Sequence, residues 1–375
     1  MTHRAATLSP VTTARTSTPP PARRPRARRA TPAVHRAFFA LLLLTLSLAA
    51  AGCPCVNSIV NASPGLRWWL FSTYGAERVC PEMMKTSLPL SLQNGSASIG
   101  RFFPKTCSHQ VNEQGETLIV HVQGDGYAYL PTAKRVGFSM TVSVEYRPDF
   151  RIEGDDLYLW GRLQRVAAGP DFRIQFVENP VVDMATSMTP MGSAATFLGT
   201  QVVNSFLARG FTVVHNEDRG NEFSLGILMP PARPFRPFQV DDDDAYTFAN
   251  ETLDLHTGQR DFLGPFEITD KDQQLSLRFN VTGTPIEAMV VPKPLGDLWR
   301  DAHQRTGATG GPPGQPLMGI PIQPGMMNRK LKLAPGLYYV VLDNTSTAGF
   351  VNPPVNLNPL FDPAVRVSYV AQLVE

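Results

Sequence analysis

Residues 138–146 read FSMTVSVEY, and every second side chain in this stretch is apolar or aromatic. A period of two is typical of a β-strand that buries one face and exposes the other. Three further stretches repeat the pattern, at residues 117–122, 157–163 and 172–176. The acidic, glycine-containing stretch 153–156 lies between two of them and is typical of a hairpin turn. The sequence therefore predicts an antiparallel sheet with one solvated face.

One amphipathic helix is expected after these strands, over residues 190–209. Thr189 can cap its start, Pro190 suits the first helical position and Gly210 can end it. Apolar residues recur at the helical spacing and form a stripe: Met191, Ala195, Leu198, Val202 and Phe206. A further strand is expected at 223–228.

A curved antiparallel sheet followed by such a helix resembles the tubular lipid-binding superfamily, which includes small lipoproteins of the bacterial periplasm. In those proteins the sheet wraps a long helix and leaves a groove for acyl chains. The resemblance covers about residues 118–228 and lies in the order of elements, without a sequence motif. It implies that Met191, Leu198, Val202 and Phe206 line a groove for an apolar ligand. The alternative is that the stripe only packs against the sheet, as most apolar helix faces do.

A second set of strands is predicted after the proline-rich stretch 230–237, which reads as a stiff linker. The segment 331–342 is LKLAPGLYYVVL, in which a Pro-Gly turn separates a strand from an aromatic-rich strand, and this pattern predicts a hairpin. The segment resembles the PPC and GOLD types of β-sandwich. That resemblance implies an accessory, binding or folding module, with no catalytic residues to transfer.

These observations predict a mainly β chain with one or two helices, organised in three parts. Residues 1–52 are expected to be a signal peptide with a long basic, disordered n-region. Residues 53–232 are expected to form an antiparallel sheet-plus-helix (α+β) domain, and residues 238–375 an all-β sandwich domain. Within the latter, the Gly/Pro-rich stretch 302–327 is expected to be a mobile loop whose methionines could contact a partner protein.

The export signal is the apolar run at residues 37–52, AFFALLLLTLSLAAAG, which follows an arginine-rich segment. Sixteen residues are short for a membrane span, which needs about 20. The run ends in Ala50-Ala51-Gly52-Cys53, which resembles the lipobox of bacterial lipoproteins, although alanine stands where leucine is usual. The resemblance implies cleavage before Cys53 and acylation of its sulfur, so that lipid holds the chain at a membrane of the cell envelope. The alternatives are ordinary secretion, with Cys53 as a plain thiol, and an uncleaved anchor.

Acylation of Cys53 would leave three cysteines, Cys55, Cys80 and Cys107. Thiols outside the cytoplasm tend to oxidise, and Cys80 and Cys107 are predicted to form a disulfide that closes a loop of about 27 residues. A metal site is the less favoured interpretation, because the sequence contains no CxxC pair and His109 is the only nearby histidine.

The sequence contains no GxSxG, HExxH, P-loop or GxGxxG pattern, the motifs that would indicate catalysis. His215 with Glu217 and Asp218 is the best polar cluster, but it reads as a solvated turn between two strands. The acidic run Asp241–Asp244 could bind Ca²⁺, yet it lacks the alternating ligands and the glycine of a calcium loop, and a solvated turn is the preferred interpretation. No cofactor is expected.

The net charge of +2 is due to the predicted signal peptide, residues 1–52, which contains eight arginines and no acidic residue. Without them, 26 basic residues face 32 acidic ones, a net charge of −6, which gives no attraction to nucleic acid. The expected function is therefore a non-enzymatic envelope lipoprotein that binds lipid or another apolar ligand, or an envelope protein partner. The alternatives are a purely structural or assembly protein, and an envelope hydrolase whose site the sequence does not reveal.

Overall fold

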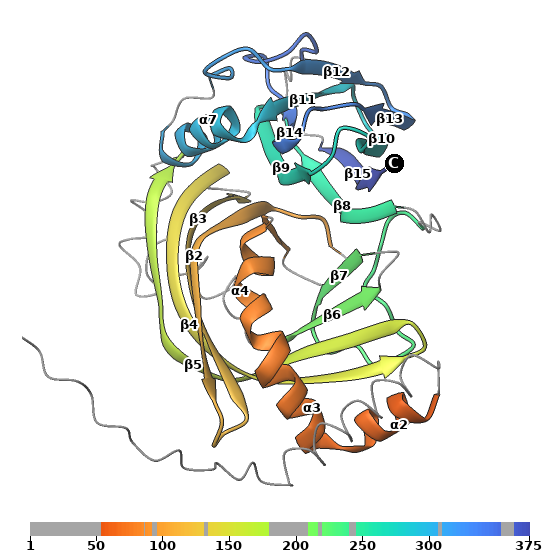
Figure 1. Cartoon of the computed structure of the whole chain (residues 1–375). Helices are drawn as coiled ribbons and strands as arrows, with labels where there is room; N and C mark the ends of the chain where they lie inside the picture. Colours follow the sequence, from red (N-terminus) through yellow and green to blue (C-terminus); the bar gives the residue numbers. More distant parts are fainter. Residues whose placement is uncertain are drawn as a thin grey trace, which may run out of the picture. The chain divides into compact units, whose positions relative to one another are not determined.

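The computed structural model describes residues 54–85, 87–91, 96–130, 134–179, 209–216, 220–239, 245–306, 310–353 and 364–375 (Figure 1). The chain divides into two compact units, Met1–Val56 and Asn57–Glu375. All of the strands belong to the second unit.

Seven antiparallel strands form one sheet in chain order, from β1 to β7. Their bounds are Leu88–Leu90 (β1), Gly100–Asn112 (β2), Thr117–Leu130 (β3), Lys134–Glu153 (β4), Asp156–Val177 (β5), Phe211–Asn216 (β6) and Gly220–Leu225 (β7). The four alternating stretches predicted as strands lie within β3, β4 and β5, and the predicted turn joins β4 to β5. The stretches 157–163 and 172–176 are not separate strands, however, because β5 continues through Gly169-Pro170. Strands β4 and β5 are 20 and 22 residues long, and the sheet curls along them (Figure 1).

A helical segment precedes this sheet, and the sequence patterns did not predict it. It consists of α2 (Pro54–Ala62), α3 (Pro64–Leu70), the π-helical turn η1 (Phe71–Gly75) and α4 (Ala76–Lys85). Ser63 caps α3, because its Oγ accepts a hydrogen bond from the Leu66 N–H at 3.4 Å, and Pro64 takes the first helical position.

Helix α4 lies on the concave side of the curled sheet (Figure 1). Ala76 and Cys80 of α4, together with Phe71 of η1, share one apolar core with side chains of β2, β3 and β4. The helix within the curl therefore comes before the sheet in the chain. The helix predicted at 190–209 would follow the sheet, and it lies outside the described residues.

The C-terminal strands form two four-stranded antiparallel sheets, in the orders β13-β10-β15-β8 and β12-β11-β14-β9. Their bounds are Ala245–Leu255 (β8), Gln259–Ile268 (β9), Gln274–Thr282 (β10), Ile286–Pro292 (β11), Met318–Ile322 (β12), Gly325–Leu331 (β13), Gly336–Asn344 (β14) and Val365–Val374 (β15). Apolar side chains from both sheets share one core, the arrangement of a β-sandwich. The predicted fold class, mainly β with a sheet-plus-helix region before a sandwich, is confirmed.

Two predictions inside the sandwich were wrong. The segment 331–342 is not a hairpin, because β13 pairs with β10 in one sheet whereas β14 pairs with β9 and β11 in the other. The Pro-Gly turn instead carries the chain between the two sheets. The stretch 302–327 is not a single loop: helix α7 (Lys293–Arg305) extends into it, β12 lies within it, and β13 begins there. Backbone pairing with β11 and β10 explains how a Gly/Pro-rich stretch forms strands.

The curled sheet and the sandwich meet within the second compact unit. Phe103 and Tyr127 of the sheet share an apolar cluster with Phe262 of β9 and Trp299 of α7. Helix α7 approaches β4 so closely that a Cβ on Gly137 would lie 1.7 Å from the backbone oxygen of Gln304, and only glycine leaves room for this contact.

Candidate functional site

The inner face of the curled sheet is the surface that shares its core with η1 and α4. Strand pairing aligns its side chains in rows across the strands, such as Leu118 with Tyr146 and then Leu163. Two rows contain glycine on β3: Gly124 faces Met140, and Gly126 faces Phe138. A Cβ on Gly126 would lie 2.6 Å from the Phe138 ring, so the missing side chain makes room for an aromatic ring.

The inner face becomes progressively more exposed from β3 to β7. Leu118 and Val120 of β3 and Phe138 of β4 are buried. Farther along the sheet, the inward side chains are only half-buried, and Phe223 of β7 is 44% exposed. We call this partly buried surface the apolar strip. It consists of Phe150, Leu159, Leu163, Phe172, Ile174, Phe211 and Phe223.

Aromatic rings connect the buried core to the apolar strip. Phe172 stacks on Phe138 with 4.6 Å between ring centroids. Phe211 meets the edge of Tyr146 at 5.2 Å and stacks with Phe223 at 6.0 Å. These contacts hold the strip residues in defined positions even though water reaches them, so the strip is a preformed surface.

Charged side chains near the apolar strip occupy the alternate positions of the same strands. Asp171 and Arg173, which flank Phe172, form an ion pair at 2.9 Å, and Glu145 pairs with Arg165 at 2.5 Å. Since successive side chains of a strand point to opposite faces, these charges belong to the outer face. The strip therefore offers an apolar contact surface.

A polar pair stands at one end of the strip. His215 of β6 faces Asn221 of β7, one row beyond the row of Val213 and Phe223. The His215 Nδ1 lies 2.8 Å from the Asn221 Oδ1, and the histidine is exposed. His215 was predicted to lie in a solvated turn between two strands; it is exposed, but it lies within β6. Its predicted neighbours Glu217 and Asp218 lie outside the described residues.

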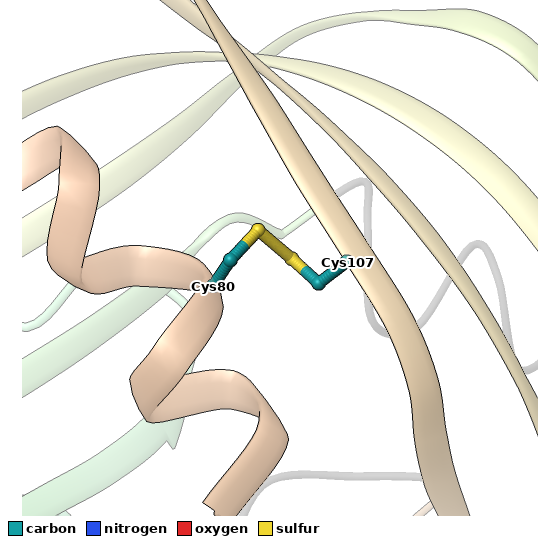
Figure 2. Close-up of a disulfide and its surroundings, with 2 residues drawn as sticks. All are labelled: Cys80 and Cys107. Carbon is teal, nitrogen blue, oxygen red and sulfur yellow. A yellow bond between two sulfur atoms is a disulfide. The ribbon is translucent and has the colours of Figure 1, made fainter.

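The predicted disulfide between Cys80 and Cys107 is present, with a Cα–Cα distance of 5.3 Å and a sequence separation of 27 residues. Figure 2 shows that it joins α4 to the strand β2. Both cysteines belong to or contact the core of the curled sheet. The bond therefore fixes the helix on the inner face beside β2, whereas the apolar strip lies on β4 to β7 of the same face.

The proline-rich segment predicted as a linker packs on the outer face of β5–β7. The Trp160 indole donates a hydrogen bond to the Leu228 carbonyl at 2.6 Å. The buried carboxylate of Glu222 pairs with Arg233 at 2.8 Å and with Arg236 at 2.7 Å. These contacts cover the outer face of the strands that carry the exposed end of the apolar strip.

A buried ionic network joins β2 to the sandwich. The Arg101 guanidinium contacts Asp261 at 2.8 Å and Glu251 at 2.7 Å, and Tyr127 donates a hydrogen bond to Asp261 at 2.5 Å. Burial opposes the charge of Arg101, but the two carboxylates raise its pKa well above the ordinary value. A cavity of only about 10 Å³ lies beside Asp261, room for a single water. This network is a buried joint between β2 and the sandwich.

A second buried polar contact connects His303 of α7 with β3 and β4 of the curled sheet. The Arg135 Nη1 donates to the His303 Nδ1 at 2.7 Å, and the His303 Nε2 lies 2.9 Å from the Tyr129 hydroxyl. Since a guanidinium only donates, Nδ1 must accept, and the single proton of the neutral ring resides on Nε2. Burial, with Arg135 and Arg260 nearby, holds the pKa of His303 well below its ordinary value.

The remaining predicted site residues lie outside the described part of the chain. They are Cys53, the helix stripe Met191, Leu198, Val202 and Phe206, and the acidic run Asp241–Asp244. Among the described residues, no group of three or more His, Cys, Asp and Glu side chains could hold a metal ion. No helix among them is both long and apolar enough to cross a membrane.

Comparisons with known proteins assign no relative. No family model matches the chain, and no curated protein matches it. Among solved structures, it is similar to a glycoside hydrolase family 43 arabinoxylan arabinofuranohydrolase from Bacillus subtilis in complex with cellotetraose. The identity is 8% and the TM-score 0.21, over 73% of this chain and 67% of that one. A TM-score this low assigns neither fold nor activity.

Proposed function

We propose that this chain is a membrane-anchored envelope lipoprotein that binds an amphiphilic ligand with an acyl chain on the inner face of its curled sheet. The observation that carries the proposal is the apolar strip. Its aromatic and aliphatic side chains are held in place but only partly buried, Phe223 being 44% exposed, and apolar surface that stays accessible on a folded chain marks interaction sites.

The polar pair His215 and Asn221 supports the amphiphilic part of the proposal. An acyl chain would lie along the strip, and the polar end of the ligand would lie beside this pair. Each methylene that leaves water contributes about 0.8 kcal/mol. A chain of about ten carbons therefore gains enough to offset the several kcal/mol lost when the ligand is immobilised.

The anchor rests on the sequence. The apolar run at 37–52 ends in small residues directly before Cys53, the pattern expected for cleavage and acylation at that cysteine. The acyl groups would hold the protein at a membrane, where amphiphilic ligands are concentrated. The proposed role is binding or carriage of such a ligand, without a chemical step.

A second candidate function is an assembly or scaffolding lipoprotein. The buried network of Arg101, Asp261 and Glu251 favours it, because this network fixes the curled sheet against the sandwich. A rigid joint suits a protein that presents two surfaces in a constant arrangement. In that case, the apolar strip would contact a protein partner instead of a lipid.

The test compares two exposed phenylalanines with the same substitution. Phe223→Ser removes the most exposed ring of the strip, whereas Phe350→Ser removes a ring that is 87% exposed and lies in the sandwich. Displacement of a fluorescent fatty acid measures ligand affinity. We expect Phe223→Ser to weaken binding about tenfold, since a buried aromatic contributes about 1.5–3 kcal/mol, and Phe350→Ser to leave it unchanged. Equal affinities for all three proteins would contradict the proposal.

A further inference from the structure

The helices that begin the described chain expose large apolar side chains. Ile59 of α2 is 62% exposed, Trp69 of α3 is 44% exposed and Tyr74 of η1 is 63% exposed. The rings of Trp69 and Tyr74 touch edge to face, with 6.1 Å between centroids. They therefore form one aromatic patch instead of two isolated side chains.

The exposed rings are not needed for the core of the curled sheet. Phe71 is buried in that core, and Trp68 packs against it while its indole donates to Glu113 at 3.0 Å. Trp69 and Tyr74 are instead 44% and 63% exposed to water. Exposed tryptophan and tyrosine side by side form an apolar surface with hydrogen-bonding groups at its edge.

The position of this surface in the chain indicates what covers it. Helix α2 begins at Pro54, the residue directly after Cys53, and Ile59 is six residues from that cysteine. Six residues span at most about 22 Å even when fully extended. If Cys53 is acylated, the first turns of α2 cannot be far from the surface of the bilayer.

The charges around the patch are balanced. Exposed Glu77 is followed by exposed Arg78, and Lys85 pairs with Glu82 at 2.6 Å. This mixture offers no basic cluster for anionic headgroups. Contact with lipid would depend on the aromatic rings, whose polar edges and apolar faces suit the membrane–water interface.

We propose that Ile59, Trp69 and Tyr74 form a lipid-contact face that inserts into the interfacial layer of the membrane. This inference rests on the proposed anchor at Cys53 and adds a second attachment to it. Acyl chains alone would tether the protein with free rotation, whereas the aromatic contact fixes which side of the protein meets the bilayer. A second contact also strengthens anchoring, since stable attachment takes more than one signal.

Quenching of tryptophan fluorescence by brominated lipids tests the face directly. The processed protein is incorporated in vesicles of phosphatidylethanolamine and phosphatidylglycerol at three to one, with bromine on the acyl chains. We expect quenching in the wild type, its loss in Trp69→Phe, and no change between low and high salt. Phe350→Trp in the Trp69→Phe background is the matched control, because its new exposed indole should not be quenched.

The outcomes separate the lipid-contact face from the anchor. Mass measurement of the processed protein shows whether Cys53 carries acyl groups. If Cys53 is acylated, two results would contradict the lipid-contact face and leave the anchor supported. One is unchanged quenching in Trp69→Phe, and the other is equal quenching of the tryptophan at position 350. If Cys53 is unmodified but Trp69-dependent quenching occurs with added vesicles, the anchor is wrong and the face stands. Conversion of a dimer to a monomer by Trp69→Phe, without quenching, would identify a protein interface and overturn the proposal.

Discussion

The imidazole of His303 is a buried group whose neutral state is coupled to folding. Its pKa is well below the ordinary value because the ring is buried and Arg135 and Arg260 are nearby. In the unfolded chain the ring titrates near pH 6.5. Between that value and the lower folded pKa, the unfolded state binds more protons, so the free energy of unfolding falls as pH falls. The slope that this residue contributes is about 0.7 kcal/mol per pH unit at about pH 6.5 and approaches about 1.4 kcal/mol per pH unit at lower pH.

Denaturant unfolding between pH 7.5 and 5.5 measures this slope, with His303→Gln as the comparison. Glutamine does not titrate, so the variant should lose stability at all pH values but show a flatter dependence on pH. Asp343 has the opposite effect, because burial raises the pKa of its carboxyl group and protonation then favours the folded state. Asp343 is present in both proteins and cancels in the comparison. Parallel pH profiles would contradict the assigned role of His303.

Little of this residue-scale chemistry could be predicted from the sequence. Arg101 and Asp261 are 160 positions apart, and nothing in either local pattern indicates that they meet in the interior. Strand alternation places a side chain on one face or the other but does not show which charges another part of the chain will bury. The Cys80–Cys107 pair was predictable because cysteines of a chain with a predicted export signal are expected to oxidise, and few pairings were open.

At the scale of elements, the disulfide holds α4 on the inner face of the curled sheet. The bond closes a loop of 27 residues between the helix and β2. Loop-closure estimates give about 3 kcal/mol for a loop of this size. We expect Cys80→Ser with Cys107→Ser to lower the free energy of unfolding by about that amount, measured by urea denaturation. A change below about 1 kcal/mol would mean that packing alone holds the helix.

The strands were predictable because β3, β4 and β5 alternate over many residues, whereas the helices at 54–85 were missed. Their signal is local: Ser63 and Pro64 are a helix start, and Ala76 and Cys80 are buried one turn apart. The π-turn η1 and Pro81 within α4 interrupt the regular period, which hides the amphipathic pattern. The residues Phe172 and Ile174 of the apolar strip lie on a strand that the sequence predicted. Their partial exposure could not be predicted, because it depends on how far the helices at 54–85 extend over the sheet.

At the scale of the whole molecule, sequence patterns identify strands better than their partners. The segment 331–342 was predicted as two strands around Pro335-Gly336, yet β13 already ends at Leu331, and β13 and β14 belong to different sheets. A turn signal does not distinguish a hairpin from a crossing between the layers of a sandwich, because long-range pairing decides between them. For the same reason, the sequence did not show that a helix preceding the sheet in the chain covers part of its inner face.

The central claim is that the apolar strip binds an amphiphile with an acyl chain. Native mass spectrometry of the processed protein, followed by lipid extraction, tests it most directly. We expect a fraction of the protein with added mass and an extract that contains an acyl-chain lipid in addition to that on Cys53. This fraction should be depleted in Phe223→Ser but not in Phe350→Ser. A single ligand-free mass for the wild type, unchanged when excess fatty acid is added, would contradict it.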